Sequence, residues 1–293
     1  MNRLSLQEFE VLSSLVWNGS TPSKSAFAGI DSLDAEGVKT TLHARGLIDN
    51  TGGITSSGYD ALEPYRVKRA ILLAAGFGSR LMPVTYNTPK PLARVNGVRM
   101  IDLLLDAVET AGIKEVYVIR GYLGEQFDQL LAKYKNITFI ENPMYDEANN
   151  ISSLYVARDV LSGSYVIESD LLLSNSKIIM PYQYCSNYLG VPTDETDDWC
   201  FEVTNGYISK VMVGATDCHH MFGISYWTEQ DGVKLGRDIA DAFARDPQLY
   251  WDEVPLRYYK DDFNVRVREC TFDDIVEIDT LQELQEIDSK YKA

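Results

Sequence analysis

A glycine-rich segment and two positive side chains behind it are the part of this 293-residue sequence best suited to chemistry. Residues 76–79 follow the apolar run 69–74, and small residues let a backbone approach phosphate groups closely. Arg80 and Lys90 lie ten residues apart on proline-containing chain, so they can converge on one polyphosphate. Leu81 stands where a dinucleotide fingerprint has its third glycine, and no Walker-type Gly-Lys-Ser/Thr follows. The residues therefore predict phosphate binding of another type.

Two aspartates that follow predicted strands are candidates for a magnesium site. Asp170 comes after the apolar run 164–168, and Asp279 comes after the apolar run 275–278. Carboxylate oxygens are the ligands that Mg²⁺ prefers, and the ion would neutralise a bound polyphosphate. Asp279 could instead cap a helix predicted over 281–287, and the residues alone do not decide between these roles.

The elements that must position these residues alternate between strands and helices. Short apolar runs predict strands over 69–74, 115–119, 137–140 and 164–168, and amphipathic patterns predict helices over 100–112, 125–134 and 152–160. This alternation predicts an α/β domain over residues 69–293 with a doubly wound, mostly parallel sheet. Ligands of such sheets lie beyond the carboxyl ends of the strands, where Ala74, Gly121 and Asp170 all fall.

Residues 1–68 form a second predicted domain. Helices are predicted over 4–17, 23–28, 34–45 and 55–65, with two short strands around the turn within 46–55. This order resembles a winged helix-turn-helix domain, which would either bind DNA or serve for docking or regulation. The segment has eight acidic and six basic side chains, whereas DNA affinity needs a basic face, so we favour the second role.

The composition restricts the partners and the compartment. A formal net charge of −16 disfavours binding to nucleic acid or to anionic lipid. The four cysteines contain no C-x-x-C pair, and the three histidines form no metal-ligand pattern. No apolar run approaches the ~20 residues of a membrane span, and the N-terminus has no signal-peptide pattern. We therefore expect a cytoplasmic protein without a membrane span; an oligomer is compatible with these features.

The run 73–92 resembles the nucleotidyltransferase family that makes nucleoside-diphosphate sugars and related activated alcohols. The family pattern L-A-A-G-x-G-x-R-L-x-P-x-T is matched by residues 73–85, and P-K-P-L is matched by residues 89–92. The resemblance implies a Rossmann-like nucleotidyltransferase fold and Mg²⁺ as the cofactor.

The resemblance also implies a role for each matched residue. Arg80 and Lys90 would be the catalytic cations on the phosphates, and Asp170 and Asp279 would be the metal ligands. Relatives often show Asp-x-Asp where this chain has Glu168-Ser169-Asp170, so we expect Glu168 to lie behind the ligands. The implied nucleotide-binding residues are Ala74, Ala75, Gly76, Gly78, Ser79, Gly121, Tyr122, Asn150 and Ser153.

Later segments are similar to bacterial phosphocholine cytidylyltransferases, which join CTP and phosphocholine to give CDP-choline and pyrophosphate. The similarity covers most of residues 69–293 and is carried by 121–127, 149–155, 223–227, 249–252 and 277–279. The partners implied are CTP and a phosphorylated amino-alcohol.

The acceptor is the least constrained part of this interpretation. Aromatic faces and carboxylates recognise a quaternary ammonium, so Trp199, Trp251 and Asp252 are the predicted substrate-binding residues. Trp227, on an alternating strand, is assigned to the core. The same transfer to phosphoethanolamine, 2-aminoethylphosphonate or a sugar-1-phosphate remains open. A DNA-binding regulator that senses a ligand is the alternative from another class.

Overall fold

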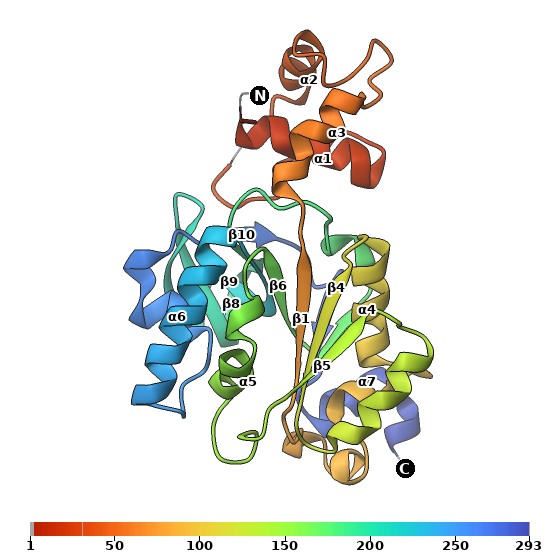
Figure 1. Cartoon of the computed structure of the whole chain (residues 1–293), viewed down its shortest axis with the longest axis vertical. Helices are drawn as coiled ribbons and strands as arrows, with labels where there is room; N and C mark the ends of the chain where they lie inside the picture. Colours follow the sequence, from red (N-terminus) through yellow and green to blue (C-terminus); the bar gives the residue numbers. More distant parts are fainter. Residues whose placement is uncertain (1–2, 31, 293) are drawn as a thin grey trace.

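One seven-stranded sheet organises the chain from Arg69 onward (Figure 1). The computed structural model describes residues 3–30 and 32–292. The strand order is β10-β8-β9-β6-β1-β4-β5, and β1 is parallel to β4 and β6, as β4 is to β5. The mostly parallel α/β fold predicted from the sequence is therefore confirmed. The strands are β1 (Arg69–Ala74), β4 (Glu115–Arg120), β5 (Ile137–Glu141), β6 (Ser164–Glu168), β8 (Asn187–Thr204), β9 (Tyr207–Trp227) and β10 (Arg266–Glu269).

Helices cover both faces of the sheet, which explains the continuous apolar run of β1. Ala70 and Leu72 belong to the core under α4 (Met100–Thr110), whereas Ile71 and Leu73 belong to the core under α5 (Ile151–Val156) and α6 (Glu229–Arg245). Successive side chains of a strand point to opposite faces, so a strand between two layers must be apolar at every position. Figure 1 shows α4 on one side of β1 and α5 with α6 on the other.

Two predicted helices have a different form. The helix predicted over 125–134 is the 3₁₀ helix η5 (Gly124–Ala132), and the one predicted over 152–160 divides into α5 and the 3₁₀ turn η6 (Arg158–Val160). Short 3₁₀ turns also follow β1, namely η2 (Ser79–Leu81), η3 (Val84–Tyr86) and η4 (Lys90–Leu92). They lie between β1 and α4, the crossover helix that leads to β4.

A small two-stranded sheet joins two distant parts of the sequence. Strand β7 (Leu171–Leu173) pairs antiparallel with β11 (Ile275–Glu277), and the N–H of Ile278 donates to the carbonyl oxygen of Asp170 at 3.0 Å. Helix α7 (Leu281–Ile287) follows β11. This pairing places Asp170 next to Asp279.

The N-terminal part consists of α1 (Leu6–Asn18), α2 (Ala35–Ala44), α3 (Ser56–Leu62) and connecting loops. A single bridge between Ile48 and Ile54 stands where two short strands were predicted. The winged-helix assignment stays a prediction. Aromatic rings join this part to the sheet domain, since Tyr65 stacks on Tyr184 with ring centroids 5.4 Å apart.

The helix predicted over 23–28 is wrong, because this segment pairs with the edge of the large sheet. The N–H of Ala28 donates to the carbonyl oxygen of Val267 at 3.0 Å, and the N–H of Glu269 donates to that of Ala26 at 2.7 Å. Phe27 forms the bridge with Arg268 of β10. Unpaired backbone groups of an edge strand can override local helix propensity, which is a weak preference.

Across the described residues, the structure shows no helix long and apolar enough to traverse a lipid bilayer.

Candidate active site

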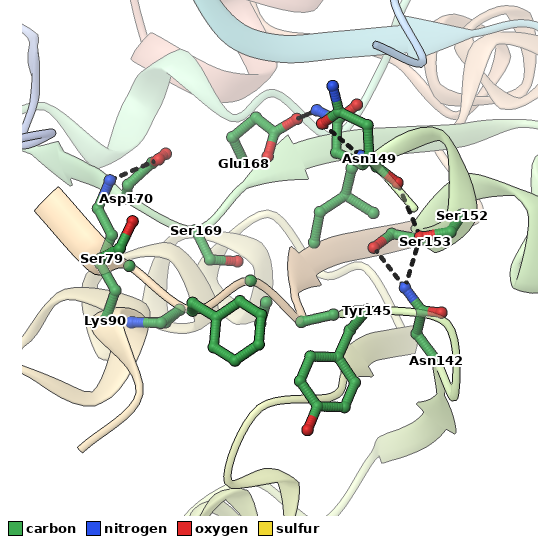
Figure 2. Close-up of a pocket in the computed structure, with 18 of the residues that line it drawn as sticks. Ser79, Lys90, Asn142, Tyr145, Asn149, Ser152, Ser153, Glu168, Ser169 and Asp170 are labelled. Atoms are coloured by element: carbon green, nitrogen blue, oxygen red, sulfur yellow. Dashed lines mark hydrogen bonds and ion pairs between the residues drawn. The ribbon is translucent and has the colours of Figure 1, made fainter. Parts of the chain in front are cut away.

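A cavity of about 350 Å³ opens at the carboxyl ends of β1 and β6 (Figure 2). The chain leaves β1 toward β4 on one side, and β6 lies on the other side of β1. Such a reversal of strand order is the switch point at which α/β sheets bind ligands. The cavity brings together most of the predicted site residues: Ala74, Ala75, Gly76, Gly78, Ser79, Arg80, Lys90, Asn150, Ser153, Asp170 and Asp279.

The glycine loop is shaped by backbone geometry at Gly78. Gly78 has a φ of +61°, which disfavours side chains, and a Cβ atom there would lie 2.8 Å from Cβ of Lys90. A Cβ at Gly76 would meet no atom within 4 Å, so this residue faces open space. The absence of a side chain at Gly78 lets Lys90 pack against the loop, and the open space at Gly76 leaves room for a ligand.

Lys90 is the central cation of the cavity. Its side chain is buried, and Nζ donates at 2.9 Å to Oδ2 of Asp170 and at 2.9 Å to Oδ1 of Asp279 (Figure 2 shows the contact with Asp170). Arg80 adds a second cation, with Nη2 2.7 Å from Oδ1 of Asp279. Burial alone would lower the pKa of Lys90, but the two carboxylates raise it above its ordinary value. Lys90 is therefore a fixed positive charge.

Three carboxylates form a cluster that could hold a divalent cation. Oxygens of Asp170, Glu277 and Asp279 lie within 4.8 Å of one another. Oδ1 of Asp170 is buried and has no hydrogen-bond partner among the described residues, so this oxygen is available as a ligand for a cation. Burial, followed by the charges of Asp170 and Asp279, raises the pKa of Glu277 to about 9.

Asp279 is not the N-cap of α7. Thr280 caps α7, because its side chain accepts a hydrogen bond from the N–H of Glu283. The Glu283 carboxylate accepts in return from the N–H groups of Asp279 and Thr280. The carboxylate of Asp279 is thus left to face Lys90. Sequence reasoning missed Glu277, although the alternation of an extended chain puts residues 277 and 279 on one face.

The predicted acceptor residues are not brought into this cavity. Trp251 is fully buried, and its Nε1–H donates to Oε1 of Glu168 at 2.9 Å. Asp252 is also buried, and burial raises its pKa to about 7. Trp199 is half-buried against Tyr250, with ring centroids 5.6 Å apart. Substrate binding by these residues stays a prediction, and the structure gives Trp251 a contact behind the cavity wall.

Glu168 lines the cavity and is held from behind. Besides Trp251, the side-chain nitrogen of Asn150 donates to Glu168 at 3.4 Å, and Oδ1 of Asn150 accepts from the N–H of Trp251 at 2.9 Å. Burial, then the charges of Asp170 and Asp252, raise the pKa of Glu168 well above its ordinary value. Glu168 is not one of the three grouped carboxylates, and its expected place behind the metal ligands stays a prediction.

Gly121 and Tyr122 lie outside the lining and support the glycine loop instead. The N–H of Tyr122 donates to the carbonyl oxygen of Ala75 at 3.0 Å, and its hydroxyl donates to that of Thr85 at 3.0 Å. A Cβ on Gly121 would lie 2.7 Å from the Tyr145 side chain, so glycine permits close packing there.

Several lining residues were missed by the sequence reasoning. Phe77 is 41% exposed and its ring lies 5.3 Å from that of Tyr145, so two aromatic faces border the cavity. The side-chain amide of Asn142 donates to the hydroxyls of Ser152 and Ser153 at 2.9 and 3.2 Å (Figure 2). For Phe77, its place between two glycines was a sequence signal of a lining residue. For Asn142 there was no such signal, because many loop residues follow a strand in the same way.

Residues 69–186 match the Nucleotidyl transferase family. A 2-aminoethylphosphonate cytidylyltransferase of Lancefieldella rimae is 37% identical over 228 residues, which are 76% of this chain and 92% of the relative. The chain belongs to the nucleotidyl transferase family. It is therefore an enzyme that transfers a nucleotidyl group.

Two further relatives bear on the chemistry of this nucleotidyltransferase. A choline-phosphate cytidylyltransferase of Haemophilus influenzae is 33% identical and covers 74% of this chain and 95% of its own length. The solved structure of the CTP:phosphocholine cytidylyltransferase from Streptococcus pneumoniae has a TM-score of 0.71 at 33% identity, covering 77% of this chain and 99% of that one. These relatives support cytidylyl transfer by this chain.

Proposed function

We propose that this nucleotidyltransferase uses Mg²⁺ to transfer CMP from CTP to phosphocholine, giving CDP-choline and pyrophosphate. The observation that carries the proposal is Lys90, buried and held between Asp170 and Asp279 beside the glycine loop. A second acceptor, 2-aminoethylphosphonate, is favoured by the name of the relative that is 37% identical. Both acceptors combine a phosphorus-bound anionic oxygen with a cationic amine.

The cavity at the ends of β1 and β6, here called the nucleotide cavity, would accommodate a nucleoside triphosphate in one orientation. The loop around Gly76 offers backbone N–H groups and open space for phosphates, and Arg80 lies beside it with an exposed side chain. Ser152, Ser153 and Asn142 lie at the other end (Figure 2), where the Ser153 hydroxyl, which accepts from the Asn142 amide, can donate a hydrogen bond to a nucleoside. Phosphates would therefore lie toward Lys90, and the base toward the serines.

Asp170, Asp279 and Glu277 would hold the Mg²⁺. Bound there, the ion would supply positive charge that stabilises the departing pyrophosphate. The unpaired Oδ1 of Asp170 and the purely carboxylate donor set fit this ion.

The chain's own residues act by positioning and by charge. An oxygen of the acceptor phosphate attacks the α-phosphorus of CTP, and the bond between that phosphorus and the bridging oxygen to the β-phosphate breaks. The nucleophile is already an anion, so no side chain needs to remove a proton. Lys90 would stabilise charge on the α-phosphate, and Arg80 would hold the leaving phosphates.

Pyrophosphate release tests this proposal. CTP, ATP, GTP and UTP are crossed with phosphocholine, phosphoethanolamine, 2-aminoethylphosphonate and glucose-1-phosphate. We expect turnover with CTP and an amine acceptor, in Mg²⁺ but not in excess chelator. Equal rates with glucose-1-phosphate, or no release from CTP with either favoured acceptor, would overturn it. Lys90→Met should be nearly inactive, whereas Lys39→Met, a change on α2 in the N-terminal part, should match the unaltered enzyme.

A further inference from the structure

The connection between α1 and α2 is held against the sheet domain by a buried carboxylate. Residues 25–29 of this connection, here called the strap, lie along β10. Oε1 of Glu10, on α1, accepts from the hydroxyl of Ser25 at 2.7 Å and from the N–H of Ala26 at 2.8 Å. Glu10 and Ser25 are both buried, and a buried carboxylate is costly without such donors. The position of α1 and the conformation of the strap therefore depend on each other.

The strap also packs on the turn of the β8–β9 hairpin. A Cβ atom on Gly206, which has a φ of +81°, would lie 2.3 Å from the carbonyl oxygen of Ala28. A Cβ atom on Gly29 would lie 2.6 Å from the backbone nitrogen of Gly206. The carbonyl oxygen of Gly206 in turn accepts from the N–H of Val267, on β10, at 3.2 Å. Glycine at both positions lets two backbones approach closely, so the strap, β10 and the hairpin turn form one junction.

This junction is connected to the cluster of three carboxylates in the candidate active site. Glu269 of β10, whose N–H donates to the carbonyl oxygen of Ala26, has its Oε1 3.1 Å from Nε2 of His219 on β9. The next residue, His220, lines a cavity of about 280 Å³ that also reaches the carboxylate cluster. Strand β10 itself leads, through residues 270–274, into β11, which carries part of the cluster. The strap thus contacts the two elements that adjoin the cluster from outside the nucleotide cavity.

We propose that the N-terminal part positions β10 and the β8–β9 hairpin for catalysis, and that Glu10 is the positioning residue that fixes the strap. The inference rests on the proposed function and assigns a task to residues 1–68, which that function leaves without one. No residue of the N-terminal part lines the nucleotide cavity found among the described residues, so CTP binding should not depend on the strap. The effect should appear in kcat instead, because β10 leads into the strand that carries part of the carboxylate cluster.

Steady-state kinetics of the full chain, with CTP and phosphocholine or 2-aminoethylphosphonate, test the role of Glu10. Glu10→Ala removes the acceptor of two hydrogen bonds and should lower kcat by about fivefold, a usual size for a contact remote from the chemistry. The KM for CTP should stay within about twofold of the unaltered enzyme. Glu10→Gln keeps a side-chain oxygen for both donors and should retain the unaltered kcat. Asp60→Ala, at an exposed acid of α3 in the same part, is the control and should change neither constant.

Gly206→Ala tests the junction from the other side, without a change in the N-terminal part. The added methyl group would collide with the carbonyl oxygen of Ala28, so kcat should again fall by about fivefold. Gly52→Ala is the matched control, because Gly52 has a φ of +82° and a Cβ atom there would meet no atom within 4 Å. This control carries the same backbone strain and leaves the strap in place, so its kcat should not change.

Hydrogen exchange followed by mass spectrometry measures positioning without turnover. Peptides from residues 193–220 and 266–279 should exchange faster in Glu10→Ala and Gly206→Ala than in the unaltered protein, whereas peptides from residues 69–92 should not. An unchanged kcat in both variants would overturn this inference alone, whatever the exchange of the strap itself. Equal losses in kcat and in CTP binding, with faster exchange throughout the chain, would indicate general unfolding and would also overturn it. An unaltered enzyme that converts neither amine acceptor would overturn the proposed function, and faster exchange of the hairpin in both variants would still support the positioning role.

Discussion

Asp252 gives the structure a pH dependence that can be measured. The carboxyl group is buried beside Glu253, and burial raises its pKa from 3.8 to about 7. The folded protein therefore holds this proton up to about pH 7, whereas the unfolded chain releases it near pH 3.8. The free energy of unfolding should fall as the pH rises between these values and should level off above pH 7.

The magnitude follows from the pKa difference. The pKa of this group is 3.8 in the unfolded chain and about 7 in the folded protein. The group therefore lowers the free energy of unfolding by about 2–3 kcal/mol between pH 5 and pH 8. An amide in place of this carboxyl group carries no proton equilibrium, so Asp252→Asn should gain stability relative to the unaltered protein by this amount over the same pH range. Removal of the charge also lowers the pKa of Glu168, which changes stability in the same direction.

Urea unfolding at pH 5, 6, 7 and 8, followed by tryptophan fluorescence and circular dichroism, measures this difference. Agreement of the two signals is needed before a single free energy is assigned. Asp246→Asn, at an exposed position six residues earlier, is the control and should follow the unaltered protein at every pH. Parallel stability profiles for Asp252→Asn and the unaltered protein would refute the reasoning.

Three other substitutions have expected outcomes. Lys90→Met should reduce kcat by about 10²–10³, because one preorganised positive charge is lost. Mg²⁺ should raise the Tm of this variant more than that of the unaltered protein, because Lys90 no longer occupies the carboxylates of Asp170 and Asp279. Equal Tm shifts with Mg²⁺ would contradict the proposal that Lys90 and Mg²⁺ share these two carboxylates. Gly78→Ala should raise the KM for CTP and cost about 1–3 kcal/mol in urea unfolding, because of the φ of +61° and the 2.8 Å approach to Lys90; unchanged values would refute a strained loop. Trp251→Phe should cost about 1–3 kcal/mol, since it removes the donor to Glu168; an unchanged unfolding midpoint would show that this hydrogen bond is not needed.

The sequence was sufficient for strands β1, β4, β5 and β6 and for the glycine loop, because both leave local signals. A strand between two helical layers must be apolar throughout, and β1 is; a loop that approaches both Lys90 and a ligand needs glycine at Gly78 and space at Gly76. These constraints act on neighbouring residues, so they appear as runs and short spacings. The predicted positions of Arg80, Lys90, Asp170 and Asp279 around one cavity agree with this.

What the sequence could not supply depends on contacts between distant residues. The pairing of β7 with β11 joins Asp170 to Glu277, and no local spacing announces it. Trp251 and Asp252 are predicted to bind substrate because tryptophan beside an acid is unusual in a core, yet Asp252 is itself buried and Trp251 finds a partner in Glu168. Tertiary hydrogen bonds and packing explain why both side chains are buried, and their role in substrate binding stays a prediction.

The pairing of residues 26–28 with β10 bears on the solubility of the protein. An uncovered edge strand presents free N–H and C=O groups to the edges of other molecules and promotes aggregation. Here the N-terminal chain covers part of that edge, through the hydrogen bonds of Ala28 with Val267 and of Glu269 with Ala26. A truncation at residue 68 would expose these backbone groups of β10, and we expect the truncated protein to self-associate more than the full chain.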